Sequence, residues 1–125
     1  MAWQFESGLP IYRQLVDRIR MMIAGGEFKP GDRIPAVREL ALEAGVNPNT
    51  MQKALAQLEK DGLIFSQRTA GRFVTQDGET LRALRQELGK GYISTMFENL
   101  RKLGLSDQEI LKAVREHAEE RGGVG

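Results

Sequence analysis

The spacing of apolar residues predicts a helix near the N-terminus. Ile11, Leu15 and Ile19 recur at intervals of four residues and therefore share one helical face, with charged residues on the other faces. Pro10 stands at the start, where the missing N–H of a proline costs nothing. Gly25-Gly26 ends the pattern, because glycine tolerates the left-handed conformation of a helix C-cap. We therefore expect one amphipathic helix between these two signals.

Two further helices are predicted over residues 36–44 and 48–60, joined by a short turn. Gly45 ends the first of them. The second begins where Asn47, a favoured N-cap residue, is followed by Pro48 at the first helical position. Two short helices joined by a turn that contains glycine form the outline of a helix–turn–helix.

Strand-like segments surround and follow these helices. Residues 63–66 and 72–75 are short apolar runs, and the polar residues 67–71 between them are typical of a hairpin tip. A hairpin directly after a helix–turn–helix is a wing. Earlier in the chain, Pro30-Gly31-Asp32 has the composition of a tight turn, and Arg33-Ile34 after it is expected to be extended.

The residues beyond Gln76-Asp77-Gly78 have a different character. Leucines and aromatic residues at helical spacing predict a long helix over residues 79–103, in which Gly89 and Gly91 interrupt the pattern and permit a kink. A second helix is expected from Ser106, because Ser-x-x-Glu is the spacing of a capping box.

The elements together define the expected fold class. It is mainly α-helical with a small β-hairpin: a winged helix–turn–helix over residues 9–76 is followed by a two-helix segment over residues 79–121.

Net charge does not by itself indicate a DNA-binding protein. The 125 residues include 18 lysines and arginines against 17 aspartates and glutamates, for a net charge of +1. Ten basic and nine acidic residues precede Gly78, so the first part of the chain is also nearly neutral. DNA-binding domains are commonly basic, and binding would require the positive charges to be sorted onto one face.

Composition argues against an enzyme. The chain has no cysteine and one histidine, His117, so thiolate catalysis, zinc-finger ligand sets and His-rich metal sites are excluded. The sequence contains no glycine-rich phosphate loop and no metal-ligand spacing, and we expect no cofactor and no metal. It also lacks a secretory signal and an apolar run of about 20 residues, so we expect a cytoplasmic protein without a membrane partner.

The start of the helix over 48–60 carries groups that match base edges. Asn and Gln amides pair with adenine, and Lys pairs with guanine or phosphate. The alternative to DNA recognition is a solvated helix start with solubilising arginines around it. The convergence of the polar groups of the two helices and the hairpin on one side of the motif argues against this alternative. The candidate DNA contacts are Arg38, Asn47, Asn49, Thr50, Gln52 and Lys53 on the helices, Arg68, Thr69 and Arg72 on the hairpin, and Arg33 as a weaker phosphate contact.

The apolar stripe of the C-terminal segment allows two interpretations. It packs either on its own following helix or against a second copy of the chain. Two helices alone bury too little apolar surface to be stable, and we therefore favour a homodimer. The expected interface comprises Leu84, Leu88, Tyr92, Met96, Leu100, Ile110 and Val114.

Several motifs resemble the DNA-binding domain of the GntR family, in order and over about residues 9–76. The Asn-Pro-Asn-Thr start of the second helix and the short C-terminal segment are similar to the YtrA-type subgroup. The matching segments are Pro10–Leu15, Lys29–Pro35, Val37–Ala41, Gly45–Thr50, Ala54–Glu59, Gly62–Ile64 and Gly71–Val74.

This resemblance implies a dimeric bacterial repressor that binds a palindromic double-stranded operator, often controlling its own operon and a neighbouring ABC-type transporter. It places the family's DNA-contacting arginine on Arg38, the recognition-helix contacts on Asn47, Asn49, Thr50, Gln52 and Lys53, and the wing contacts on Arg68 and Thr69. Many members carry a basic residue where Pro48 and Gln52 stand, and the usual first glycine of the wing is Thr69 here.

Two other functions remain open at this level. The near-neutral charge would suit a winged helix that serves as a protein-interaction adaptor without specific DNA binding. A metabolite sensor would need a pocket, and about 47 residues after Gly78 are too few to enclose the roughly 300 Å³ that such pockets occupy. Any small-molecule effector, whose identity the sequence does not give, would therefore have to bind between subunits or between the domain and the C-terminal helices.

Overall fold

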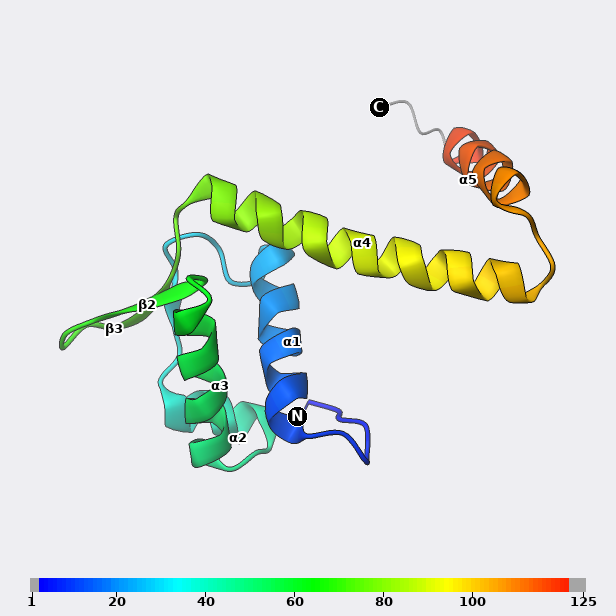
Figure 1. Ribbon diagram of the computed structural model, residues 1–125. Helices are drawn as coiled ribbons and strands as arrows, with labels where there is room; N and C mark the ends of the chain where they lie inside the picture. The colour runs from blue at the N-terminus through cyan, green and yellow to red at the C-terminus, as the bar shows by residue number, and fades with distance from the viewer. Residues whose placement is uncertain (1–2, 122–125) are drawn as a thin grey trace. The chain divides into compact units, whose positions relative to one another are not determined.

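A computed structural model describes residues 3–121 of the chain (Figure 1). It divides into two compact units, an N-terminal unit that ends at Arg85 and a C-terminal unit that begins at Gln86. The long helix α4 (Gly78–Lys102) contributes residues to both units, and each unit is described by itself.

Three helices form the frame of the N-terminal unit. They are α1 (Ile11–Ala24), α2 (Val37–Ala44) and α3 (Pro48–Lys60), and they confirm the helices that the apolar spacing predicts. Gly45 lies between α2 and α3 with φ 76°, a left-handed conformation that glycine adopts without strain. This single residue lets the chain leave α2 and begin α3 within a few residues.

The expected hairpin is part of a three-stranded antiparallel sheet. Strands β2 (Ile64–Gln67) and β3 (Gly71–Val74) form the hairpin, which we call the wing, and β1 (Arg33–Ile34) pairs along the other edge of β3. Arg33 is opposite Phe73 in this register. Sequence pattern predicts the extended pair 33–34 but not its partner, because that pairing spans the whole helix–turn–helix.

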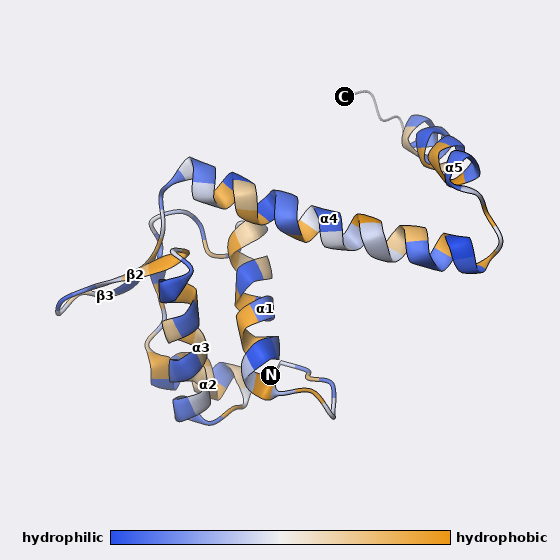
Figure 2. Cartoon of the chain, viewed as in Figure 1, coloured by the Kyte–Doolittle hydropathy of each residue, from blue (hydrophilic) through white to orange (hydrophobic). Residues whose placement is uncertain are grey.

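The core of the N-terminal unit draws on every element. Leu81 and Leu84, in the first turns of α4, are also buried, so this helix begins as part of the N-terminal unit. Figure 2 shows the apolar faces of the helices as orange bands. The fully buried side chains of this unit include Leu15, Ile19, Ile34, Leu40, Met51, Leu55, Leu58, Ile64 and Val74.

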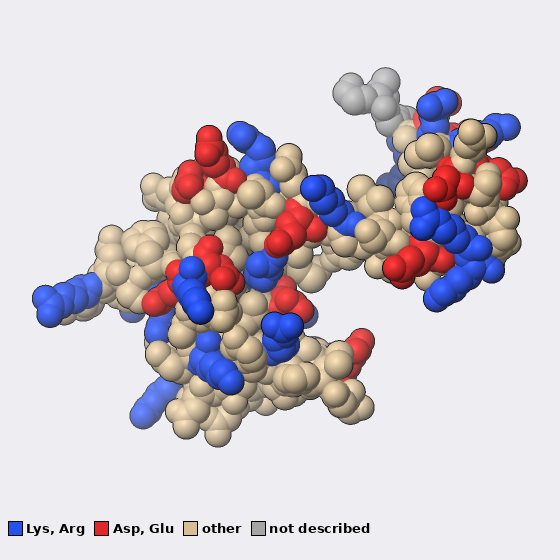
Figure 3. Space-filling view, viewed as in Figure 1, with Lys and Arg blue, Asp and Glu red and all other residues tan. Residues whose placement is uncertain are grey.

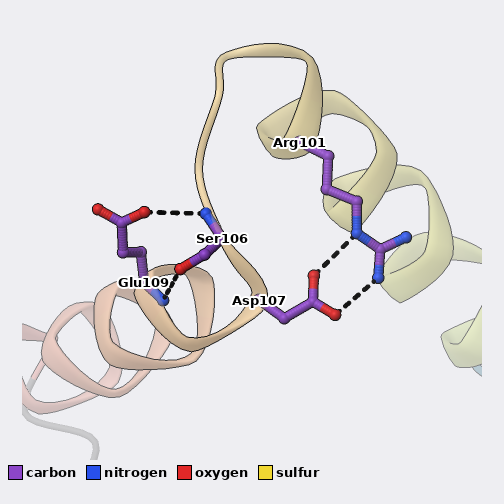
Figure 4. A network of polar contacts seen from close by, with 4 residues as sticks. All are labelled: Arg101, Ser106, Asp107 and Glu109. Atoms are coloured by element: carbon purple, nitrogen blue, oxygen red, sulfur yellow. Dashed lines mark hydrogen bonds and ion pairs between the residues drawn. The ribbon is translucent and has the colours of Figure 1, made fainter.

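The C-terminal unit consists of the later turns of α4 and the helix α5 (Asp107–Glu120). The helix α4 continues through Gly89 and Gly91, so these glycines do not interrupt it. The predicted capping box is present: Ser106 Oγ accepts from the Glu109 N–H at 3.1 Å, and Glu109 Oε1 accepts from the Ser106 N–H at 2.9 Å (Figure 4).

A bidentate ion pair spans the corner between these two helices. Arg101 near the end of α4 donates from Nε and Nη2 to the two carboxylate oxygens of Asp107, at 2.8 and 3.1 Å (Figure 4). The Arg101 guanidinium also holds the pKa of the Asp107 carboxyl below its ordinary value. An exposed ion pair thus bridges the corner between α4 and α5, and the capping box closes the start of α5.

Candidate nucleic-acid interface

Local hydrogen bonding fixes the start of α3. Asn47 is its N-cap, and Asn47 Oδ1 accepts from the Asn49 N–H at 2.7 Å. Pro48 occupies the first helical position, where no N–H is needed. The helix therefore begins where the sequence predicts, and its first residues have a defined orientation.

One face of α3 is polar and exposed. Met51, Ala54, Leu55 and Leu58 are buried against the other elements of the unit. Because helical residues repeat every 3.6 positions, the opposite face presents the remaining side chains to solvent. Asn47, Asn49, Gln52 and Lys53 are exposed and Thr50 is half-buried.

Arg38 lies in the first turn of α2, the helix that packs against α3. It is exposed, whereas Leu40 and Ala41 of the same helix are buried. The guanidinium therefore lies at the surface of the helix–turn–helix, where it can contact a base or a phosphate.

The tip of the wing is also exposed and positively charged. Arg68 and Thr69 lie in the turn between β2 and β3. The charged side chains that Figure 3 shows at the tip are basic, whereas acidic and basic side chains are mixed elsewhere on that face. Thr69 adopts φ 63°, which a β-branched residue rarely does. The wing thus keeps, with a threonine, the backbone conformation that a glycine would adopt there freely.

Two of the expected DNA contacts are engaged within the protein. Arg72 Nε donates to Glu59 Oε1 at 2.8 Å, and both side chains are less than one-third exposed. Arg33 Nε donates to the carbonyl of Ala70 in the wing turn at 3.0 Å. Arg72 therefore connects the wing to α3, and Arg33 connects the wing turn to β1.

Glu59 is the acceptor that organises this part of the unit. Its carboxylate accepts from the Ser66 hydroxyl on β2 as well as from Arg72 on β3. The Ser66 hydroxyl and the Arg72 guanidinium hold the pKa of the Glu59 carboxyl below its ordinary value, although partial burial opposes them. The sequence gives no signal for this cluster, because Glu59 looks like any surface glutamate of an amphipathic helix.

Tyr12 is a second residue that sequence reasoning does not single out. The Lys53 ammonium of α3 lies 4.5 Å from the centroid of the Tyr12 ring on α1. The Tyr12 hydroxyl donates to Gln57 Oε1 at 3.1 Å, and Gln57 Nε2 donates to Asp61 Oδ1 at 3.0 Å. A tyrosine one position beyond an apolar helix face gives no indication of such partners.

A cavity of about 470 Å³ lies between the N-terminal segment and α1. Gln14 holds that segment in place, accepting from the Glu6 N–H at 2.8 Å and donating to the carbonyls of Glu6 and Leu9 at 2.9 and 3.2 Å. The lining residues include Trp3, with the Arg18 guanidinium 5.1 Å from the centroid of its ring, and none of the expected DNA contacts.

No cluster of three potential metal ligands occurs among residues 3–121. Within the same part of the chain, no helix is both long enough and apolar enough to cross a membrane.

These features define the class of protein. A helix–turn–helix whose second helix exposes amides at a capped start, followed by a hairpin with a basic tip, is a winged-helix DNA-binding unit. The chain belongs to the GntR family: the family model for bacterial regulatory proteins of the gntR family matches residues 11–74.

Relatives along nearly the whole chain support the same assignment. The HTH-type transcriptional regulator YhcF of Bacillus subtilis is 33% identical over 116 residues, 93% of this chain and 96% of its own length. The HTH-type transcriptional repressor YtrA of B. subtilis is 35% identical over 98 residues, 78% of this chain and 71% of its own length. The chain is thus a YtrA-type regulator within the family.

Solved structures connect this fold to DNA. A GntR family transcriptional regulator from Listeria monocytogenes superposes with a TM-score of 0.80 at 33% identity, covering 90% of this chain and 98% of its own. The DNA-binding domain of AraR in complex with its operator ORX1 matches with a TM-score of 0.54 at 32% identity, over 58% of this chain and 93% of that one. The protein is therefore a DNA-binding transcription regulator, and its relatives are regulators rather than enzymes.

Proposed function

We propose that α3 enters the major groove of an operator and reads base edges from its N-terminal half. The observation that carries this proposal is the exposed polar face at the capped start of α3, backed by a fully apolar face. Amides at such positions pair with adenine, and phosphates flank them on both sides of the groove. The proposed contacts from the helices are Arg38, Asn47, Asn49, Thr50, Gln52 and Lys53.

The wing has a separate task in this proposal. Arg68 and Thr69 at its exposed tip contact the DNA backbone or the adjacent minor groove. Arg72 and Arg33 remain proposed contacts to the DNA, and the Nε atom of each also donates to a group within the protein. Glu59, Arg72 and Ser66 together set the angle at which the wing leaves α3.

The C-terminal unit is proposed to pair two copies of the chain. Among its described residues only Ile110 is buried, while Ile93, Leu103, Leu111 and Val114 are at least 40% exposed. Two helices with one buried apolar side chain cannot hold a stable hydrophobic core. A second copy would cover the exposed apolar side chains and form a four-helix arrangement.

The expected interface residues divide into two groups in the structure. Leu84 is buried in the N-terminal unit and Ile110 in the C-terminal unit, so both side chains are already covered within a single chain. The residues that keep part of their surface exposed are Leu88, Tyr92, Met96, Leu100 and Val114. In functional terms, residues 9–76 then form the DNA-binding part and residues 79–121 the pairing part.

A dimer of this kind suits a palindromic operator. Two recognition helices related by a two-fold axis contact half-sites about 34 Å apart, or a multiple of that distance. We further propose that the protein represses its own operon from such a site, with a neighbouring transporter operon as a second target, and that it acts in the cytoplasm, where the chromosome lies. The cavity beside Trp3 is a place where an effector could bind without touching the proposed DNA contacts.

Footprinting on the DNA upstream of the protein's own gene tests this function. We expect protection of two half-sites on one face of the duplex. Arg38→Ala should weaken operator binding by about 1–3 kcal/mol and affect random DNA much less, as expected for a base contact. Arg115→Ala on α5 is the matched control, since Arg115 is exposed but lies outside the proposed interface. Equal losses on operator and random DNA would instead make Arg38 a phosphate contact.

A further inference from the structure

Tyr12 on α1 makes two contacts to α3, and both involve residues close to the proposed DNA surface. Its ring faces the Lys53 ammonium, whose nitrogen lies 4.5 Å from the ring centroid. Its hydroxyl donates to Gln57, which lies one helical turn beyond Lys53. A single half-buried side chain thus connects the first helix to two consecutive turns of the recognition helix.

The geometry of α3 shows where these contacts direct Lys53. Residues four positions apart advance by 400°, so each step along the row Asn49, Lys53, Gln57 turns 40° around the helix. The row therefore begins at Asn49 on the exposed face and reaches, at Gln57, the side of α3 that contacts Tyr12. Lys53 lies between them, with its ammonium drawn sideways toward α1.

A charge held at the flank of a recognition helix faces the wall of the groove and not its floor. The floor presents base edges, whereas the walls are the sugar–phosphate backbones. Lysine is a compact point charge that suits a phosphate, and its flexible stem would otherwise sample many positions. The ring of Tyr12 restricts that freedom by a cation–π contact.

We propose that Tyr12 is a positioning residue that holds Lys53 against α1 as a phosphate clamp, so that Asn49 and Gln52 are left to contact bases. This inference rests on the proposal that α3 faces the operator. It assigns to Tyr12 a role in DNA binding, and it assigns Lys53 to the backbone rather than to guanine.

The test is the salt dependence of operator binding by the full chain. Each phosphate contact contributes about 0.9 to the slope of log K against log salt concentration. Lys53→Met keeps the length of the side chain but removes its charge. It should reduce the magnitude of that slope by about one on operator and random DNA alike. An unchanged slope in Lys53→Met would overturn the assignment to phosphate.

Two substitutions separate the ring of Tyr12 from its hydroxyl. Tyr12→Phe keeps the ring and should keep the slope of the unsubstituted protein. Tyr12→Leu removes the ring and should weaken binding about two- to fivefold, the factor that corresponds to an exposed cation–π contact. In the Lys53→Met background, Tyr12→Leu should cause no further loss. An equal loss with and without Lys53 would show that Tyr12 only supports the fold.

Thermal unfolding of each variant accompanies the binding measurements. Should Tyr12→Leu fail to fold, Tyr12→Met, which also lacks the ring, takes its place in the comparison with and without Lys53. Asn49→Ala and Arg38→Ala distinguish this inference from the proposed function. If they weaken operator binding while the Tyr12 and Lys53 variants do not, only the clamp is wrong; if none of them weakens it, α3 does not face the DNA.

Discussion

Arg72 on β3 and Glu59 on α3 are joined by an ion pair in which Nε lies 2.8 Å from Oε1. The two residues lie 13 positions apart, and the first strand of the wing lies between them in the sequence. Because Ser66 on β2 donates to the same carboxylate oxygen, both strands of the wing are connected to α3 at one point. The orientation of the wing relative to α3 therefore depends on this glutamate.

Glu59→Gln should weaken that connection. The substitution keeps the shape and an acceptor oxygen but removes the charge, and we expect the free energy of unfolding to fall by about 1 kcal/mol or less, as for a partly exposed ion pair. Operator affinity should fall as well, because the wing is less well positioned. Urea unfolding and binding titrations measure the two effects. Glu43→Gln, at an exposed position of α2, is the control and should change neither.

The stability of the N-terminal unit should decrease in acid. The pKa of Glu59 is lowered by the Ser66 hydroxyl and by Arg72, and the pKa of Asp77 is lowered by the Thr80 hydroxyl and by the N–H of Glu79 at the start of α4. A carboxyl whose pKa is lower in the folded state adds stability that is complete well above its unfolded pKa of about 4. That stability is lost as pH falls through the folded value.

Melting temperatures measured between pH 7 and pH 3 check this expectation. They should be nearly constant at the upper end of the range and should fall below about pH 4. The Glu59→Gln variant should show a smaller fall, since it has already lost one of the groups responsible. A melting temperature that rises on acidification would contradict the sign of both pKa shifts.

The wing turn should respond in opposite directions to two substitutions. Thr69 has φ 63°, and a side chain in that conformation costs about 1–2 kcal/mol. Glycine avoids this cost but adds conformational entropy to the unfolded chain. Thr69→Gly should therefore raise the free energy of unfolding by up to about 1 kcal/mol. Gly71 has φ 108°, and an added Cβ would lie 2.9 Å from Arg33 Nε. Gly71→Ala should therefore destabilise the unit by about 1–3 kcal/mol.

Both variants can be compared by chemical denaturation under the same conditions. The hydrogen bond from Arg33 to Ala70 makes the second substitution more damaging, because the guanidinium must move away from the turn to admit the new methyl group. Equal effects of the two substitutions would mean that the wing turn is not held in this conformation in solution.

The dimer predicts a specific effect on α5. Val114→Asp would place a charge in the proposed interface, where an unpaired carboxylate is costly to bury, and sedimentation should show dissociation to monomers. Ala113→Asp introduces the same group one position away and about 100° around the helix. It should leave the dimer intact. A Val114→Asp protein that sediments as a dimer would exclude α5 from the interface.

The sequence by itself determined the local structure of the chain. Helix starts and ends were predictable because their signals lie within a few residues: Asn47 and Pro48 open α3, and Ser106 and Glu109 form the cap of α5. The exposed face of α3 followed from the period of its apolar residues, which also placed Asn49 and Gln52 at the surface. The resemblance to the family rests on the same local motifs, and the match over residues 11–74 confirms it.

Only the tertiary structure decided which side chains pair within the protein. The sequence predicts Arg72 and Arg33 as DNA contacts, and the structure adds that β3 brings the first next to Glu59 and β1 brings the second next to the wing turn. The contact between Tyr12 and Lys53 spans 41 positions and depends on how α1 packs on α3. Such pairings follow from long-range packing, which leaves no periodic trace in the sequence, whereas caps and helix faces are set by neighbours along the chain.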